Sequence, residues 1–221
     1  YEWKLLNQGG IIDRSISALD EPIVKLTDID ADNDMDLVYG SRSGSQMNIF
    51  RLNNDKFEYF QSLNNSYNAE DVKFIDLNGD FVQDIIVSGY FGEGQPGFRV
   101  FTSLDGGAGF NETFSAEGLA YAKIKFTDIN NDGIQEIAHI GQTSTAGFLA
   151  NLRVNIYEQN GTSLVGPLNI SDQFTDLKNG AFDFGNVDQD SDIDFAITGL
   201  GGLGADSKLY LNETVFTETV D

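Results

Sequence analysis

The sequence is poor in several residue types, and each shortage narrows what the protein can be. It has no cysteine and one histidine in 221 residues. Disulfides and thiolate metal sites are therefore excluded, and zinc and the softer metals lack their usual ligands. The three prolines, Pro22, Pro96 and Pro167, are expected in loops, where a missing N–H group is harmless. No apolar run approaches the roughly 18 residues that span a bilayer, so we expect no membrane insertion.

Basic residues are also scarce. Thirteen Lys and Arg residues face 35 Asp and Glu residues, which gives a formal net charge of -22. A field of this sign repels nucleic acids and anionic membranes and attracts cations. We therefore expect no nucleic-acid partner.

The apolar content, 40% of the residues, is sufficient for a core, either in one large β domain or in two small ones. Because the chain does not begin with Met, we expect a mature form or a piece of a longer protein. N-glycosylation sequons occur in mild excess over chance, which is consistent with an extracellular glycoprotein. They lie at Asn64, Asn111, Asn160, Asn169 and Asn212.

An acidic stretch of ten residues occurs four times. "DIDADNDMDL" at residue 28 recurs as "DLNGDFVQDI" at 76, "DINNDGIQEI" at 128 and "NVDQDSDIDF" at 186. Each copy has Asp or Asn at its first, third and fifth places, an acid at its ninth place and an apolar residue at its tenth. Four unrelated, solvated acidic loops would not share this pattern, so the stretch is the mark of an internal repeat.

The flanks of the four stretches alternate between apolar and polar residues. "IVKLT" precedes the first copy, and "LVYG" and then "MNIFRL" follow it. Such period-two alternation predicts strands, with four antiparallel strands in each repeat and the acidic loop between the first two. Because a lone sheet cannot bury both faces, radial stacking into a β-propeller is expected.

The predicted fold is therefore an all-β propeller of four-stranded antiparallel blades. A single domain or segment, 1–221, would hold a leading half repeat at 1–20. Four whole repeats would follow at 21–68, 69–118, 119–175 and 176–221.

The acidic loops have the chemistry of a calcium site. Asp and Asn oxygens at alternate places can surround a shared centre, and the backbone carbonyl at the seventh place can join them. Ca²⁺ takes six to eight such oxygens, whereas Mg²⁺ demands a stricter octahedron. An EF-hand is excluded, because it needs Glu at the twelfth place and flanking helices. The twelfth residues here are Tyr39, Val87, His139 and Ile197.

The pattern D-x-D/N-x-D-G-x-x-D on β repeats of this size resembles the FG-GAP/VCBS repeats of the integrin α-subunit propeller and its bacterial relatives. The resemblance extends over essentially the whole chain and implies three to four Ca²⁺ ions. Carried over, the ligands of the first two sites are Asp28, Asp30, Asp32 and Asp36 with the carbonyl of Asp34, and Asp76, Asn78, Asp80 and Asp84 with the carbonyl of Val82. Those of the last two are Asp128, Asn130, Asp132 and Glu136 with the carbonyl of Ile134, and Asn186, Asp188, Asp190 and Asp194 with the carbonyl of Asp192.

Three features depart from the family pattern. The sixth place favours Gly because the loop turns sharply there, but only Gly133 satisfies this, against Asn33, Phe81 and Ser191. Phe81 is the least suited to a left-handed backbone, which weakens the second site most. Glu136 is one methylene longer than Asp, and Asn186 carries no charge.

The resemblance implies an extracellular, calcium-stabilised module for binding or adhesion. A protein or glycan partner would meet the loops opposite the calcium sites, 41–47, 90–97, 142–151 and 200–207, with Tyr90, Phe91 and Phe148 as candidate anchors. Two alternatives stay open: a structural spacer in a surface filament or large adhesin, and part of a polysaccharide-degrading enzyme. We do not expect an enzyme, since a calcium-bound carboxylate stays ionised and cannot act as a general acid.

Overall fold

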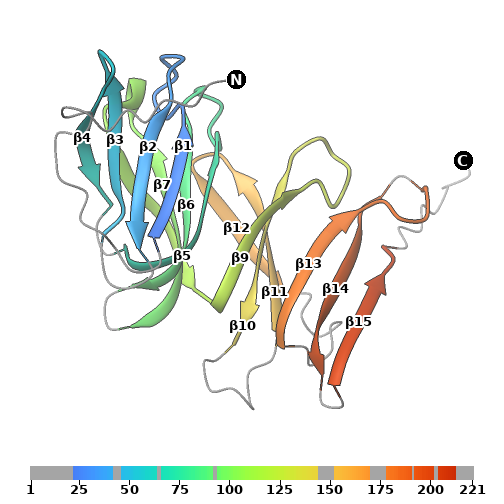
Figure 1. The fold of residues 1–221 in the computed structure, drawn as a ribbon. Helices are drawn as coiled ribbons and strands as arrows, with labels where there is room; N and C mark the ends of the chain where they lie inside the picture. The colour runs from blue at the N-terminus through green and yellow to red at the C-terminus, as the bar shows by residue number, and fades with distance from the viewer. Residues whose placement is uncertain are drawn as a thin grey trace, which may run out of the picture. The chain divides into compact units, whose positions relative to one another are not determined.

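The computed structural model describes residues 22–41, 46–63, 66–91, 94–143, 152–169, 178–190, 192–201 and 204–212. This part of the chain is all-β, with fifteen strands and one short 3-10 helix (Figure 1). No helix within it is long and apolar enough to cross a membrane. The predicted half repeat at 1–20 lies outside the described residues, and so does the end of the last predicted repeat, 213–221.

The strands form four antiparallel sheets, which confirms the prediction of an all-β fold with blade-like sheets. The first two sheets have the orders β1-β2-β3-β4 and β5-β6-β7-β8, and the third has the order β12-β11-β10-β9. The fourth, β13-β14-β15, has three strands among the described residues. Arrangement of the sheets around one axis stays a prediction.

The bounds of the strands follow the alternating segments of the sequence. The first sheet comprises β1 (Pro22–Thr27), β2 (Asp36–Ser41), β3 (Asn48–Asn53) and β4 (Lys56–Ser62). The second comprises β5 (Ser66–Ile75), β6 (Asp84–Phe91), β7 (Gln95–Ser103) and β8 (Phe110–Glu117), with the 3-10 helix η1 (Asp105–Gly107) before β8. The third comprises β9 (Ala120–Thr127), β10 (Glu136–Gln142), β11 (Leu152–Asn160) and β12 (Ser163–Asn169). The fourth comprises β13 (Lys178–Gly185), β14 (Asp194–Gly201) and β15 (Gly204–Tyr210).

The second strand of each of the first three sheets is buried along its length. In β2, β6 and β10 nearly every side chain is buried, whereas β1 alternates between exposed and half-buried positions. Burial on both faces explains why these strands read as continuous apolar runs, such as "IIVSG" in β6. His139 in β10 is one of these core residues, and burial lowers its pKa to about 3.

The chain divides into two compact units. The first contains Tyr1–Lys123 and Asn160–Leu164, and the second contains Ile124–Gln159 and Val165–Asp221. In the first unit, Val38 and Ile49 of the first sheet pack in one cluster with Val72, Ile85 and Val87 of the second sheet.

The core of the second unit is built in the same way. Ala138 and Ile140 of β10 pack in one cluster with Phe195 and Ile197 of β14. Counted from the start of each acidic stretch, the eleventh and thirteenth residues lie on one face of a sheet, which we call the trailing face. The tenth and twelfth residues lie on the opposite face, which we call the leading face. In both units, the trailing face of one sheet packs against the leading face of the sheet that follows it in the chain.

The prediction for the three prolines is wrong, because all three lie in strands. Pro22 is the first residue of β1, and Pro167 lies in β12; both strands are at the edges of their sheets. An edge strand has one side without a ladder, so a residue without an N–H group can be placed there. Pro96 lies near the start of β7, where its carbonyl accepts a hydrogen bond from the N–H of Gly118 at 3.0 Å.

Candidate metal sites

Each acidic stretch forms the loop between the first two strands of its sheet, as predicted. The carboxylate at the first place shapes the turn, because its two oxygens accept N–H groups from the fifth and sixth places. In the first loop, Asp28 accepts from Asp32 at 3.2 Å and from Asn33 at 3.0 Å. Asp76 and Asp128 make the equivalent pairs of bonds in the second and third loops. In the fourth loop, the side-chain oxygen of Asn186 accepts from the N–H of Gln189 at 2.8 Å.

The backbone turns into the left-handed region twice in each of the first three loops. The sixth place does so as expected, with φ of 72° at Asn33, 68° at Phe81 and 87° at Gly133, and Ser191 lies outside the described residues. The fourth place does so as well, which the sequence analysis missed. Its residues are Ala31, Gly79, Asn131 and Gln189. In the sequence, only Gly79 and Asn131 indicate a left-handed backbone at this place, because Gly and Asn adopt it more readily than other residues.

In the first, second and fourth loops, the ninth-place acid joins the loop to a residue beyond the second strand. Asp36 is buried, and its oxygens accept the N–H of Ile29 at 3.0 Å and the N–H of Leu52 at 2.9 Å. The second of these donors belongs to β3, so one carboxylate joins the loop to the third strand. Asp84 does the same with Leu77 and Ser103, and Asp194 with Val187 and Asn212. The longer Glu136 instead reaches the adjacent N–H groups of Ile129 and Asn130.

Burial sets the ionisation of these ninth-place acids. It raises the pKa of Asp36 to about 6, although the N–H groups of Ile29 and Leu52 act in the opposite direction. Burial likewise raises the pKa of Asp84 and of Glu136. A cation in the loop would favour the ionised form and oppose these shifts.

The first loop brings three of its acids together. Oxygens of Asp28, Asp30 and Asp36 all lie within 4.8 Å of one another, and no other such group of acidic or His residues occurs in the described part of the chain. One oxygen of Asp30 forms an ion pair with Arg51 at 3.1 Å. Its other oxygen, and one oxygen of Asp34, are buried without a hydrogen bond. Converging carboxylates with unsatisfied buried oxygens fit a hard cation such as Ca²⁺.

The second and third loops satisfy their acids differently. Their third place is Asn, and its amide donates to the fifth-place carboxylate, from Asn78 to Asp80 at 3.0 Å and from Asn130 to Asp132 at 3.1 Å. In the second loop, the hydroxyl of Ser103 also donates to Asp80, at 3.1 Å. Burial alone would raise the pKa of Asp80, but these bonds and the N–H of Val82 together lower it.

The fourth loop holds its centre with an amide at the first place. The side chain of Asn186 donates to the carbonyl of Asp190, and Asp190 accepts the N–H of Asp192 at 3.0 Å. Asp188 accepts the N–H of Asp190 at 3.3 Å. Calcium ligation in this loop, as in the second and third, stays a prediction.

The seventh-place residues differ in their surroundings. Val82 and Asp192 are buried, whereas Ile134 is exposed. In the first loop, the side chain of Asp34 contributes one of the two unsatisfied oxygens, whereas only its backbone carbonyl was predicted as a ligand. Arg51 was missed altogether, because nothing in the repeat pattern places it beside Asp30.

Comparison with known proteins supports the pattern read from the loops. No curated protein matches the chain. Residues 28–87 match the family described as an FG-GAP-like repeat, and this range includes the first two acidic loops and the strands between them. The chain therefore carries an FG-GAP-like repeat, as its acidic loops predicted.

Proposed function

We propose that this FG-GAP-like repeat protein is an extracellular, calcium-stabilised and non-catalytic module that binds a protein or glycan partner. The observation that carries the calcium proposal is the cluster of Asp28, Asp30 and Asp36, whose oxygens lie within 4.8 Å of one another. Three carboxylates this close repel one another unless a cation lies between them.

The residues of the first loop suit this role. Each oxygen of Asp36 accepts one N–H group, so a second lone pair of each oxygen stays available to an ion. Asp30 is held by Arg51 through one oxygen, and its other oxygen is the unsatisfied one. A bound Ca²⁺ would supply positive charge and remove the repulsion. Because Asp36 also contacts Leu52, ordering of the loop would extend to β3.

An extracellular location would provide enough calcium for sites of modest affinity. Extracellular calcium modules work at dissociation constants of about 0.1–1 mM, which a few carboxylates on a short loop can provide. Two of the sequon residues, Asn111 and Asn160, are exposed and could accept a glycan.

The partner surface would lie at the opposite end of each sheet. In an antiparallel sheet, the connection after the second strand returns the chain at the end away from the acidic loop. Of the candidate anchors, Tyr90 is half-buried near the end of β6. Phe91 is no longer a candidate, because it is 7% exposed and packs in the core beneath Arg99, whose guanidinium lies 4.8 Å from its ring. Phe148 lies outside the described residues.

Glycan and protein arrays test the proposal. Binding is measured in millimolar calcium and in EDTA, with Tyr90→Ala as the surface variant. Leu104→Ala, at an exposed apolar residue directly after β7 and at the acidic-loop end of the sheet, is its control. We expect a calcium-dependent signal that Tyr90→Ala weakens and Leu104→Ala does not. Thermal stabilisation by calcium without any array signal would instead favour the structural spacer. Turnover of a polysaccharide would favour the enzyme.

A further inference from the structure

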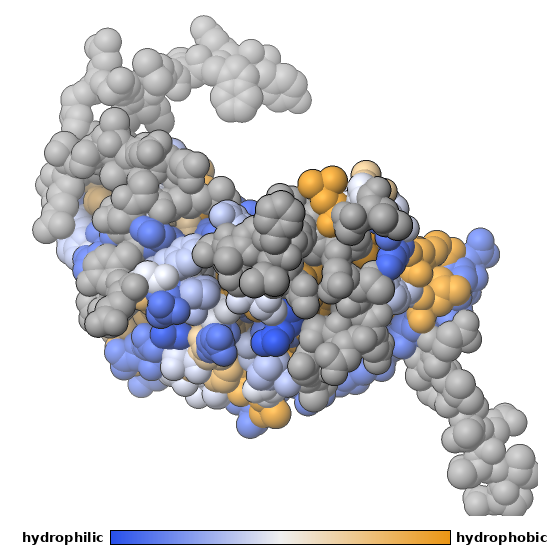
Figure 2. Space-filling view, turned by 90° about the horizontal axis from the view of Figure 1, so that it is seen from below, coloured by the Kyte–Doolittle hydropathy of each residue, from blue (hydrophilic) through white to orange (hydrophobic). Residues whose placement is uncertain are grey.

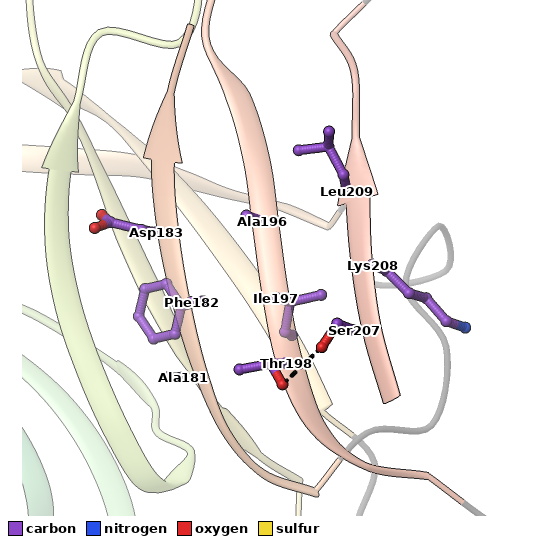
Figure 3. A pocket seen from close by; sticks show the side chains of 9 residues that line it. All are labelled: Ala181, Phe182, Asp183, Ala196, Ile197, Thr198, Ser207, Lys208 and Leu209. Carbon is purple, nitrogen blue, oxygen red and sulfur yellow. Dashed lines mark hydrogen bonds between the residues drawn. The ribbon is translucent and has the colours of Figure 1, made fainter. Parts of the chain in front are cut away.

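The last sheet presents an open face. Its trailing side carries six exposed residues: Ala181 and Asp183 from β13, Ala196 and Thr198 from β14, and Ser207 and Leu209 from β15. With the strands beneath, they line a groove of about 530 Å³ (Figure 3). The hydroxyl of Ser207 donates a hydrogen bond of 3.0 Å to the hydroxyl of Thr198. In the space-filling view, apolar surface occurs in separate patches, one of them at the right, where Figure 1 draws β15 (Figure 2).

The same positions are covered in other sheets. Val38 in β2 and Ala138 in β10 occupy the place of Ala196, and Ile140 in β10 occupies the place of Thr198. All three are fully or almost fully buried, and each belongs to a cluster shared with the leading face of the following sheet. The trailing face of this repeat is thus built to be covered by a leading face.

The first sheet presents the complementary surface. Val24 and Leu26 of β1 lie on its leading face and are 55% and 60% exposed. Their equivalents in the last sheet, Phe182 and Phe184, pack against the core of the second unit. The rest of this leading face is filled by its own cluster, Leu37, Tyr39 and Phe50. Available apolar surface on this sheet therefore lies along β1.

Charge distinguishes this pair of faces. Within the second unit, Lys125 of β9 forms an ion pair of 2.7 Å with Asp183 of β13, and the two residues occupy the same place in their repeats. The residue at this place in the first sheet is Lys25. If the last sheet of one copy were followed by the first sheet of another copy, Asp183 and Lys25 would form the same kind of oppositely charged pair. The first two sheets of one chain do not form such a pair, because both have a lysine at this place, Lys25 and Lys73.

We propose that the trailing face of the last sheet binds β1 of a second copy of this chain, head to tail. Val24 and Leu26 of one copy would cover Ala196, Thr198 and Leu209 of the other. The contact is heterologous, so it either closes into a ring or continues into a filament. The inference does not depend on calcium or on the proposed binding function.

Cysteine cross-linking tests the contact directly, because the chain has no cysteine of its own. Lys25→Cys and Asp183→Cys are made as separate proteins, mixed and mildly oxidised, and covalent dimers are read on a non-reducing gel. Lys56→Cys, an exposed lysine of β4, replaces Lys25→Cys in the matched control. We expect at least about tenfold more dimer from the proposed pair than from the control pair or from either protein alone. Equal yields would overturn the proposal.

Two further measurements distinguish a contact between copies from closure of one chain on itself. The double variant Lys25→Cys/Asp183→Cys reports such closure: an internal disulfide, with no dimer from the mixed single variants, would overturn the proposal. Sedimentation at tens of micromolar should show a mass above the monomer. The variant Leu209→Asp should sediment as a monomer and keep the melting temperature of the wild type. The control Val165→Asp, at an exposed site in β12, should sediment like the wild type. A wild-type monomer, or no effect of Leu209→Asp, would equally count against it.

Discussion

The first and second acidic loops have the same backbone but different centres. In both, the first-place carboxylate accepts the fifth and sixth N–H groups, and the buried ninth-place Asp joins the loop to β3 or to the end of β7. At the third place, Asp30 of the first loop faces Arg51, whereas Asn78 of the second donates to Asp80. Buried oxygens without a hydrogen bond occur in the first loop and not in the described second loop. The two loops therefore share the hydrogen bonds that shape their backbone and differ in the charge at their centres, so we expect their demand for a cation to differ.

The largest expected effect concerns what the two loops share. Asp36→Ala and Asp84→Ala each remove the acceptor of two N–H groups, Ile29 and Leu52 in one loop and Leu77 and Ser103 in the other. A buried donor left unsatisfied costs about 1–3 kcal/mol, so each variant should lose roughly 2–5 kcal/mol. Urea unfolding in EDTA measures this without any contribution from metal. Glu117→Ala, at an exposed acid in β8, is the control and should change stability by less than about 0.5 kcal/mol. Equally small losses at Asp36 and Asp84 would mean that these links are not structural.

The second prediction concerns calcium itself. Binding to the folded state at about 100 times the dissociation constant stabilises by about 2.7 kcal/mol. In a chain of this size, that should raise the melting temperature by roughly 5–10 °C over the value in EDTA. Asp30→Asn gives the first loop the third-place amide of the second and should remove most of the increase. An unchanged midpoint on adding calcium to the wild type would remove the calcium proposal.

The reciprocal change is the control for this result. Asn78→Asp gives the second loop the third-place acid of the first, and it replaces the amide that donates to Asp80. We expect lower stability in EDTA, because two carboxylates then face each other, and a larger increase on adding calcium. If Asn78→Asp lowers stability equally in both conditions, the charge at the third place does not decide calcium binding.

The third prediction is a reversal of order between two variants. Asp32 accepts one N–H group, from Asp34, whereas Asp80 accepts from Val82, Asn78 and Ser103. Without metal, Asp80→Ala should therefore cost more, by about 1–2 kcal/mol, since a hydrogen bond contributes about 1 kcal/mol. In saturating calcium, Asp32→Ala should cost more, because it removes a ligand from the more acidic loop. Melting curves of both variants in EDTA and in calcium test this, and the same order in both conditions would refute it.

The repeats allowed most of the fold to be predicted, because side-chain alternation marks strands and four copies of one loop outweigh a single match. The ninth-place acids were found for the same reason. Their hydrogen bonds were not, because the partners Leu52 and Ser103 follow 16 and 19 residues later, in sequence that differs between repeats. Arg51 was not predicted for the same reason: it lies in β3, where the sequence differs between repeats. Ala31 was unexpected at positive φ because L-residues with a Cβ seldom adopt it.

The smallest expected effect concerns the turn of the second loop. Phe81 has a φ of 68° and is 84% exposed, so its ring contributes little burial while its backbone is strained. Phe81→Gly should therefore stabilise the protein, because relief of about 1–2 kcal/mol of strain exceeds the entropy cost of about 0.5–1 kcal/mol for Gly. Asn33→Gly, at the same place in the first loop, should give little change, since Asn tolerates this conformation. Urea unfolding in EDTA separates the two. Destabilisation by Phe81→Gly would mean that the exposed ring makes contacts that outweigh the strain, and that the turn residue does not weaken the second loop.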